Sequence, residues 1–260
     1  GNRHATAASL VHTMHERLGE AQYAQAVTDQ DGLLGSAWVR VRGGNIQFGA
    51  GDGSIDREGD SPLLQAGAEL AQWGLLGDSD RLHLGGMLAH ARSDTQASAS
   101  FNPARAKGDT EGTLAGFYAT WFANDDNLMG AYLDAWAQYG WFDNRIRSDG
   151  LPEVNYDANS WAVSLEYGHA LAVGSRLVIE PQVQVIYTDY DMQAHTEANG
   201  TQVDDDRAGG LTSRLGVRFY GHSALASANT VQPFATLNWW RDSGYNRIAF
   251  NDVAEELRLP

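Results

Sequence analysis

Charged residues of both signs recur at alternate positions within apolar segments, and this pattern limits the chemistry that the chain can do. The acidic members are Glu69, Asp134, Glu166 and Glu180, and the basic members are Arg40, Arg42, Arg214 and Arg218. Alternation places each of these side chains on the polar face of a β-strand. Carboxylates and guanidinium groups that meet across such a face form charge-assisted hydrogen bonds, so the sequence predicts ion pairing across a polar interior. The alternative interpretation is that these groups are unpaired and hydrated in a water-filled interior.

Signals for covalent or metal chemistry are weaker. Gly77-Asp78-Ser79 has the composition of a lipolytic nucleophile segment, but no histidine lies nearby and the residues favour a tight turn. His12 and His15 are three residues apart, but a third ligand that would complete a metal site is missing. We therefore expect no metal site and no cofactor.

The elements that position the charged residues are predicted to be β-strands. The clearest is the segment from Leu128 to Phe142, in which apolar residues alternate with mixed ones. Its two faces are Leu133, Ala135, Ala137, Tyr139 and Trp141, and Tyr132, Asp134, Trp136, Gln138 and Gly140. A period of two predicts a strand, and an apolar face opposite a polar one is typical of a barrel strand between lipid and a polar lumen. A half-buried strand of a soluble sandwich has the same period, so this segment alone leaves both open.

About nine segments of similar length repeat the alternation between residues 33 and 260, which predicts an all-β chain. Tilted membrane strands need about ten residues, and these segments come close to that length. The polar faces supply the predicted pore lining, which is Arg40, Arg42, Glu69, Asp134, Gln138, Glu166, Glu180, Gln182, Arg214, Arg218 and Asn238.

The connections between the segments favour a membrane barrel over a sandwich. Long connections at 43–61, 93–109, 143–159 and 191–210 alternate with tight turns at 77–80, 124–127 and 172–175. Short periplasmic turns and long external loops explain this order, whereas a Greek-key sandwich has no reason to keep it. Five aromatic residues next to the long connections are expected at the lipid interface. They are Tyr139, Trp141, Trp161, Tyr187 and Trp239.

Residues 3–20 are predicted to form the one convincing helix, with a linker that reaches residue 24. Alanine, leucine and methionine favour a helix, and Gly19 lies where it would end. A helix of this length would span about 27 Å, close to the height of a bilayer core. His12, His15, Glu16 and Arg17 give it polar groups on more than one side, which suits a watery pore.

Composition excludes several classes of protein. The 260 residues carry a net charge of −15, with 18 basic and 33 acidic side chains, so nucleic acid is an unexpected partner. Cysteine is absent, which removes thiolate chemistry and disulfide bonds. An apolar run long enough for a membrane helix is also absent. We expect one barrel domain over residues 1–260, with the helix and linker in 1–24 and strands in 33–260.

Several sequence blocks together resemble the C-terminal translocator domain of pertactin-like autotransporters. The blocks are Met14-His15-Glu16-Arg17-Leu18-Gly19-Glu20, Gly116-Phe117-Tyr118-Ala119-Thr120-Trp121, Tyr132-Leu133-Asp134-Ala135-Trp136, Gln138-Tyr139, Trp141-Phe142 and Asn238-Trp239. The resemblance implies a monomeric, twelve-stranded antiparallel transmembrane β-barrel with the helix in its pore. It further implies type V secretion in the outer membrane of a Gram-negative bacterium, with a passenger attached ahead of residue 1. The implied partners are outer-membrane lipid, that passenger, the barrel-assembly machinery and periplasmic chaperones.

Some members of this family cleave the passenger within the pore, and the resemblance makes Asn2, Asp134 and Glu166 candidates for that reaction. The Asn-Asn junction of one such group is absent, so no firm catalytic assignment follows and we do not expect an enzyme.

The C-terminal end departs from the family pattern, because the chain stops at Arg258-Leu259-Pro260 without three further strands. An open sheet edge is costly in lipid, so we expect a fragment. Two other functions stay open. An outer-membrane protease or lipase would need acidic partners for His90 or His195, and a passive porin would need a helix outside the pore.

Overall fold

The computed structural model describes residues 6–7, 9–18, 36–50, 55–77, 79–99, 102–124, 129–174, 177–196, 200–221, 233–243, 245–250 and 253–258. Side chains are described throughout these ranges except at 18, 46–50, 55–57, 99, 102–104, 204–208, 245–250 and 253–258. Within this part of the chain, no helix is both long and apolar enough to span a membrane.

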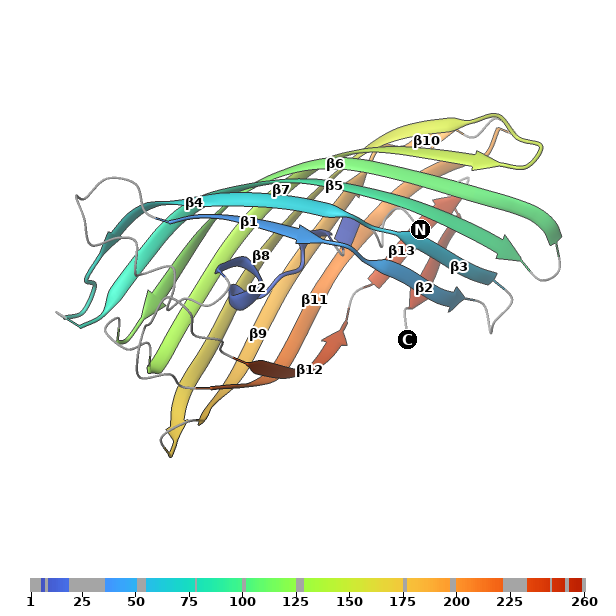
Figure 1. Cartoon of the computed structure of the whole chain (residues 1–260). Helices are drawn as coiled ribbons and strands as arrows, with labels where there is room; N and C mark the ends of the chain where they lie inside the picture. Colours follow the sequence, from blue (N-terminus) through green and yellow to red (C-terminus); the bar gives the residue numbers. More distant parts are fainter. Residues whose placement is uncertain are drawn as a thin grey trace.

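Almost all of the described chain belongs to one curled antiparallel sheet (Figure 1). Its strands are β1 (Ala37–Arg42), β2 (Asn45–Ala50), β3 (Ile55–Asp60), β4 (Leu63–Trp73), β5 (Arg81–Ala99), β6 (Asn102–Phe122), β7 (Gly130–Ser148), β8 (Val154–Val173), β9 (Leu177–Met192), β10 (His195–Thr196), β11 (Gln202–Gly221), β12 (Phe234–Asp242), β13 (Tyr245–Phe250) and β14 (Val253–Arg258). The main path runs β1-β4-β5-β6-β7-β8-β9-β11-β13-β14, and β12 pairs with the other half of β11.

The expected fold class and the strand count of about nine are confirmed. β1 continues into β2, β3 into β4 and β12 into β13 with short interruptions, so nine long strands form the wall. The α-helix α2 (Met14–Leu18) lies on the concave side of this wall (Figure 1).

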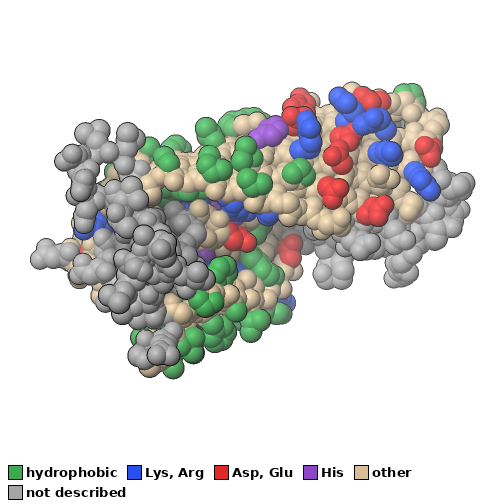
Figure 2. Space-filling view, in the orientation of Figure 1, with side chains coloured by type: hydrophobic (Ala, Val, Ile, Leu, Met, Phe, Trp, Pro, Cys, Tyr) green, Lys and Arg blue, Asp and Glu red, His purple; other side chains and the backbone are tan. Residues whose placement is uncertain are grey.

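The side-chain pattern gives the sheet one polar concave face and one apolar convex face. Along β7, burial alternates strictly from Tyr132 to Asn144, with Asp134 and Gln138 buried and Tyr139 and Trp141 exposed. Figure 2 shows hydrophobic side chains along the convex surface and charged ones gathered at one end. This inverts the usual order of a soluble protein and is the pattern expected of a barrel wall with its apolar side towards lipid.

The long connections predicted as loops are instead mostly paired strands. β5 and β6 stay in register from Arg81 opposite Phe122 to Ser98 opposite Arg105, far beyond the apolar band. β2 and β3 form another hairpin of this kind. Residues 93–109 carry polar side chains on both faces, so they lack the alternation that marks a strand in the sequence. Main-chain pairing needs no apolar face, and the hairpins therefore continue into solvent.

The prediction of one continuous helix over residues 3–20 is wrong. Residues 6–7 and 9–10 are helical, residues 11–13 are not, and α2 covers only Met14–Leu18. Side chains of the wall bind the main chain at this break, so contacts with the sheet replace hydrogen bonds within a helix.

Candidate functional site

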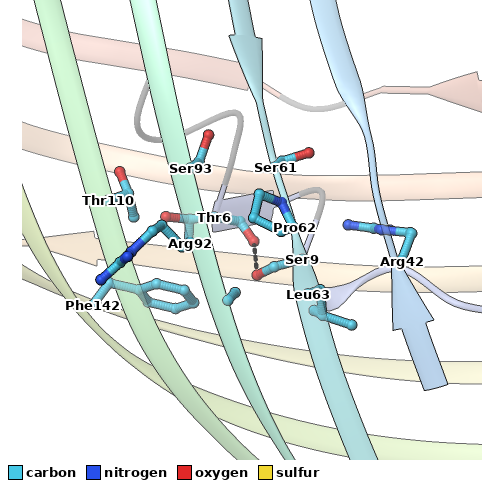
Figure 3. A pocket seen from close by; sticks show the side chains of 11 residues that line it. Thr6, Ser9, Arg42, Ser61, Pro62, Leu63, Arg92, Ser93, Thr110 and Phe142 are labelled. Carbon is cyan, nitrogen blue, oxygen red and sulfur yellow. Dashed lines mark hydrogen bonds between the residues drawn. The ribbon is translucent and has the colours of Figure 1, made fainter.

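The polar concave face surrounds residues 6–18 and forms the candidate site. Leu10, His12, Met14 and Arg17 are each at most 2% exposed, which is unusual for so short a segment. The first helical turn lies against β1 and β4–β7, where Ser9 Oγ donates to the Thr6 carbonyl at 2.6 Å beside Arg42, Leu63 and Phe142 (Figure 3). The segment therefore buries one side of its length against the wall.

Arg17 makes the central ion pair of the site. Its Nη2 atom binds Asp134 Oδ1 on β7, and both side chains are fully buried. Thr120 Oγ1 on β6 donates to the same carboxylate oxygen at 2.5 Å and accepts from Arg17 Nη2 at 3.1 Å. The guanidinium carbon lies 4.2 Å from the ring centroid of Tyr118, within cation–π range.

Glu166 on β8 binds the segment at its main chain. It lies directly opposite Asp134 in the β7–β8 register. Its Oε2 accepts the Met14 amide at 3.0 Å, and its Oε1 accepts the Tyr132 hydroxyl at 2.8 Å. Arg214 Nη2 lies 2.8 Å from Oε1, so the carboxylate is paired with a cation of β11.

Arg214 connects four strands of the wall. Its Nε donates to Gln184 Oε1 at 3.0 Å, and its Nη1 donates to Gln182 Oε1 at 2.6 Å. The same Nη1 donates to Asn238 Oδ1 of β12 at 2.9 Å. Asn238 is exposed because β12 lies at the edge of the sheet, yet its amide oxygen points to the polar network.

His15 and Glu180 form the next contact along the segment. His15 Nε2 lies 2.6 Å from Glu180 Oε1, and Gln182 Nε2 donates to that oxygen at 2.7 Å. Tyr220 of β11 donates to the other carboxylate oxygen at 3.5 Å. Glu180 therefore joins α2 to β9 and β11.

The helix α2 begins with a capping box. Thr13 Oγ1 accepts the Glu16 amide at 3.2 Å, and Glu16 Oε2 accepts the Thr13 amide at 3.0 Å. Reciprocal bonds of this kind satisfy amides that the first helical turn leaves free. Glu16 is exposed and serves the helix rather than the wall.

The remaining predicted pore-lining residues also lie on the concave side. Arg40 and Arg42 of β1 are partly buried, and Arg40 Nη1 donates to Gln65 Oε1 at 3.4 Å. Glu69 pairs with His83 at 3.1 Å. The Arg218 guanidinium lies 4.2 Å from the ring centroid of Phe234. Asn2 lies outside the described residues.

Several contacts of the site involve residues that the sequence interpretation did not single out. The His12 ring stacks on Trp136 with centroids 4.3 Å apart and an angle of 14°. Gln184 Nε2 donates to the His12 carbonyl at 2.8 Å. Alternation along the strands places Trp136 and Tyr132 on the same face as Asp134, and Gln184 on the same face as Glu180. The sequence therefore contained the information, but a selection made mainly by charge leaves these residues out.

The five aromatic residues predicted at the lipid interface lie on the convex face, where the apolar band ends and polar side chains begin. Tyr139 and Trp141 contact each other with ring centroids 4.9 Å apart, and Trp161 and Tyr187 do so at 5.3 Å. Trp161 Nε1 also donates to Asp189 at 3.2 Å. Trp239 is 58% exposed on β12.

The two histidines that an enzyme would use have partners outside the network of Arg17, Asp134 and Glu166. His90 lies 3.3 Å from Glu111, and both side chains are half exposed on the convex face. His195 stacks on Tyr156 with centroids 4.7 Å apart. In neither contact does the histidine face the carboxylates of the pore.

Known proteins resemble this chain over most of its length. The family model for the autotransporter beta-domain matches residues 37–256. YdeU of Escherichia coli (strain K12) is 33% identical over 253 residues, which are 92% of this chain and 54% of that protein. YuaQ of the same strain is 32% identical over 243 residues, which are 88% of this chain and 18% of that protein. The chain thus spans about half of one relative and less than a fifth of the other.

Two solved structures share the fold. The transport unit of the autotransporter AIDA-I from Escherichia coli has a TM-score of 0.78 at 21% identity, covering 92% of this chain and 78% of that chain. The beta domain of the Bordetella autotransporter BrkA has a TM-score of 0.64 at 25% identity, covering 83% of both chains. Because the family match includes nearly every strand of the curled sheet, this chain belongs to the autotransporter beta-domain family, the outer-membrane β-barrel translocators of type V secretion in Gram-negative bacteria.

Proposed function

We propose that this chain anchors an N-terminal passenger in the outer membrane and exports it, and that residues 6–18 stay in the pore as a plug. The observation that carries the proposal is the fully buried ion pair between Arg17 and Asp134. It joins the segment that would follow the passenger to the middle of the wall. Breaking a buried pair by removing one partner costs about 3–5 kcal/mol, enough to keep a short segment in place.

The plug is tested by removing one or both charges of this pair. Asp134→Asn leaves the Arg17 guanidinium buried without its counter-ion, so we expect the segment to leave the pore and single-channel conductance in planar bilayers to rise. The double variant Arg17→Gln/Asp134→Asn removes both charges and should conduct less than the single variant. Arg147→Gln, which loses an exposed ion pair with Asp109 outside the pore, is the matched control. Equal conductance of Asp134→Asn and the unaltered protein would contradict the plug.

We propose that Asp134 and Glu166 act as structural anchors rather than as catalysts of passenger cleavage. Asp134 binds Arg17 and Thr120, and Glu166 binds the Met14 amide, Tyr132 and Arg214. A cleavage role requires a free carboxylate near the junction, and Asn2 lies outside the described residues. Unchanged passenger processing in an Asp134→Asn/Glu166→Gln variant would support the anchor role, and loss of processing would contradict it.

The partners follow from the proposed export. We propose that residues 1–260 act as one monomeric barrel domain, with residues 1–24 as pore helix and linker, inserted by the barrel-assembly machinery with periplasmic chaperones. The apolar convex band and the five interface aromatics would contact outer-membrane lipid. AIDA-I of Escherichia coli and BmaC of Brucella suis are named adhesins, which supports a passenger that acts at the cell surface.

A further inference from the structure

The break in the N-terminal helix leaves main-chain groups that the wall binds directly. Gln138 Nε2 donates to the Leu10 carbonyl at 3.3 Å. Gln184 Nε2 donates to the His12 carbonyl at 2.8 Å, and Glu166 Oε2 accepts the Met14 amide at 3.0 Å. All three wall side chains are at most 4% exposed. The wall therefore offers two donors and one acceptor to the backbone of the segment, whatever its side chains are.

The three contacts bracket the break in the helix. The bonded groups belong to residue 10 at the end of the first helical turn, residue 12 in the non-helical stretch 11–13 and residue 14 at the start of α2. The three wall residues come from the consecutive strands β7, β8 and β9. Along the segment, the Leu10 carbonyl meets β7, the His12 carbonyl meets β9 and the Met14 amide meets β8, so three adjacent strands contribute one polar side chain each to the same short stretch of main chain.

Arg214 fixes the orientation of two of the three wall side chains. A guanidinium carries only N–H donors, so the Gln184 atom that faces Arg214 Nε at 3.0 Å must be the amide oxygen. The Gln184 nitrogen is then directed to the His12 carbonyl. The same guanidinium lies 2.8 Å from Glu166, which holds that carboxylate beside the Met14 amide.

Arg40 fixes the third side chain through an intermediary. Arg40 Nη1 donates to Gln65 Oε1 at 3.4 Å, so Gln65 turns its nitrogen to Gln138 Oε1 at 3.1 Å. Gln138 must then present its own nitrogen to the Leu10 carbonyl. Both glutamine donors are thus oriented by the wall itself, and they would keep this direction with a different segment in the pore.

We propose that Gln138, Glu166 and Gln184 form a main-chain site that binds polypeptide through its backbone, independently of sequence. The ligand class is a polypeptide segment with free main-chain groups, either residues 10–14 or the passenger chain as it crosses the pore. This inference rests on the proposed export function, because only export brings other sequences to the site. Backbone recognition suits a translocator, since every passenger presents the same amide groups.

Two variants at Met14 separate the main chain from the side chain. Met14→Pro and Met14→Ala both lose the methionine side chain, but only proline also lacks the amide that Glu166 accepts. Proline is tolerated at the first position of a helix, which Met14 occupies, so α2 should persist. We expect Met14→Pro to raise the open probability of the pore roughly fivefold above Met14→Ala, the effect of one hydrogen bond. Equal open probabilities would overturn the main-chain site.

The closing experiment asks whether the site accepts unrelated sequences. The chain has no cysteine, so Ser164→Cys, next to Gln184, can be cross-linked to a single cysteine in a stalled reporter fused ahead of residue 1. Two reporters of unrelated sequence should cross-link with similar yield, and Gln184→Met should lower both yields roughly fivefold. A yield that depends on the reporter sequence, or that is unchanged in Gln184→Met, would overturn the proposal. If the same reporters without the stalling element do not reach the surface, the export function is wrong, and the Met14 pair still decides the main-chain site.

Discussion

The concave and convex faces of the sheet use the same charged residue types in two different ways. On the concave face, Arg214 is 1% exposed and has hydrogen-bonding or ionic partners on three other strands. On the convex face, the Arg92 side chain is 58% exposed and pairs with Glu111 of the neighbouring strand at 3.2 Å. Burial, rather than the identity of the ion pair, decides how strongly each group is constrained.

The two faces differ because water can replace a lost hydrogen-bond partner only at an exposed side chain. A solvated guanidinium that loses its carboxylate regains hydrogen bonds from water, so exposed pairs contribute little. A buried guanidinium or carboxylate that loses its partner stays unpaired in a medium of low dielectric constant. The concave network therefore fixes the arrangement of strands and segment, whereas the convex pairs mainly keep the outer ends of the strands soluble.

The largest expected effect is that of Arg214→Met. The substitution leaves Glu166 buried without its cation, and we expect the free energy of unfolding to fall by about 3–5 kcal/mol. Urea unfolding in detergent measures this loss, and the double variant Arg214→Met/Glu166→Gln should recover a large part of it. Arg92→Gln on the convex face should cost under about 1 kcal/mol. Similar losses for Arg214→Met and Arg92→Gln would remove the distinction between the two faces.

Strict alternation made the wall predictable from the sequence. A period of two fixes which residues share a face, so the nine strands and the two faces of β7 follow from the pattern alone. The outer hairpins were not predictable, because residues 93–109 are polar on both faces and resemble a loop. Nor was the break at residues 11–13, since Ala, Leu and Met favour a helix and the bonds from Gln138 and Gln184 exist only in the folded wall.

Partner identity within the site also lay beyond the sequence. Parity predicts that Asp134 and Glu166 face the interior, but both carboxylates could equally have bound any inward arginine. The register places them opposite each other, and the position of the segment assigns Arg17 to Asp134 and Arg214 to Glu166. Long-range pairing of this kind depends on strand tilt and curl, which local patterns do not encode.

The second prediction compares the effect of replacing one glycine on each face by alanine. On the concave side, a Cβ atom on Gly168 would lie 2.2 Å from the ring of Tyr132, whose hydroxyl donates to Glu166. On the convex side, a Cβ on Gly86 would meet nothing closer than 3.7 Å. We expect Gly168→Ala to destabilise by about 1–3 kcal/mol by displacing the ring, and Gly86→Ala to be close to neutral. Thermal unfolding of the two variants compares the faces with the same added atom, and equal midpoints would contradict tight packing of the concave face.

The smallest effect concerns Asp80, a carboxylate outside the membrane that has no cation partner in the described structure. Trp121 Nε1 donates to it at 2.7 Å, and the amides of Leu75, Leu76 and Gly77 donate to it as well. The indole donor, with these amides, lowers the pKa of Asp80 from 3.8 to about 2. Because the folded-state pKa lies below the ordinary value, the stabilisation is fully present above about pH 5 and is lost as the pH falls through about 2.

Two substitutions test this turn and extend the comparison between the faces. The difference in melting temperature between the unaltered protein and Asp80→Asn should be constant above about pH 5 and should shrink steeply as the pH falls through about 2. Trp121→Phe removes the strongest donor but keeps the three amides, so it should raise the pKa of Asp80 and move the loss to higher pH. A difference that persists unchanged at pH 2 would mean that packing of the turn, and not its charged hydrogen bonds, makes Asp80 important. If the difference instead shrinks at low pH, neutral N–H donors are sufficient to stabilise the Asp80 carboxylate. On the concave face, by contrast, arginine side chains stabilise the carboxylates.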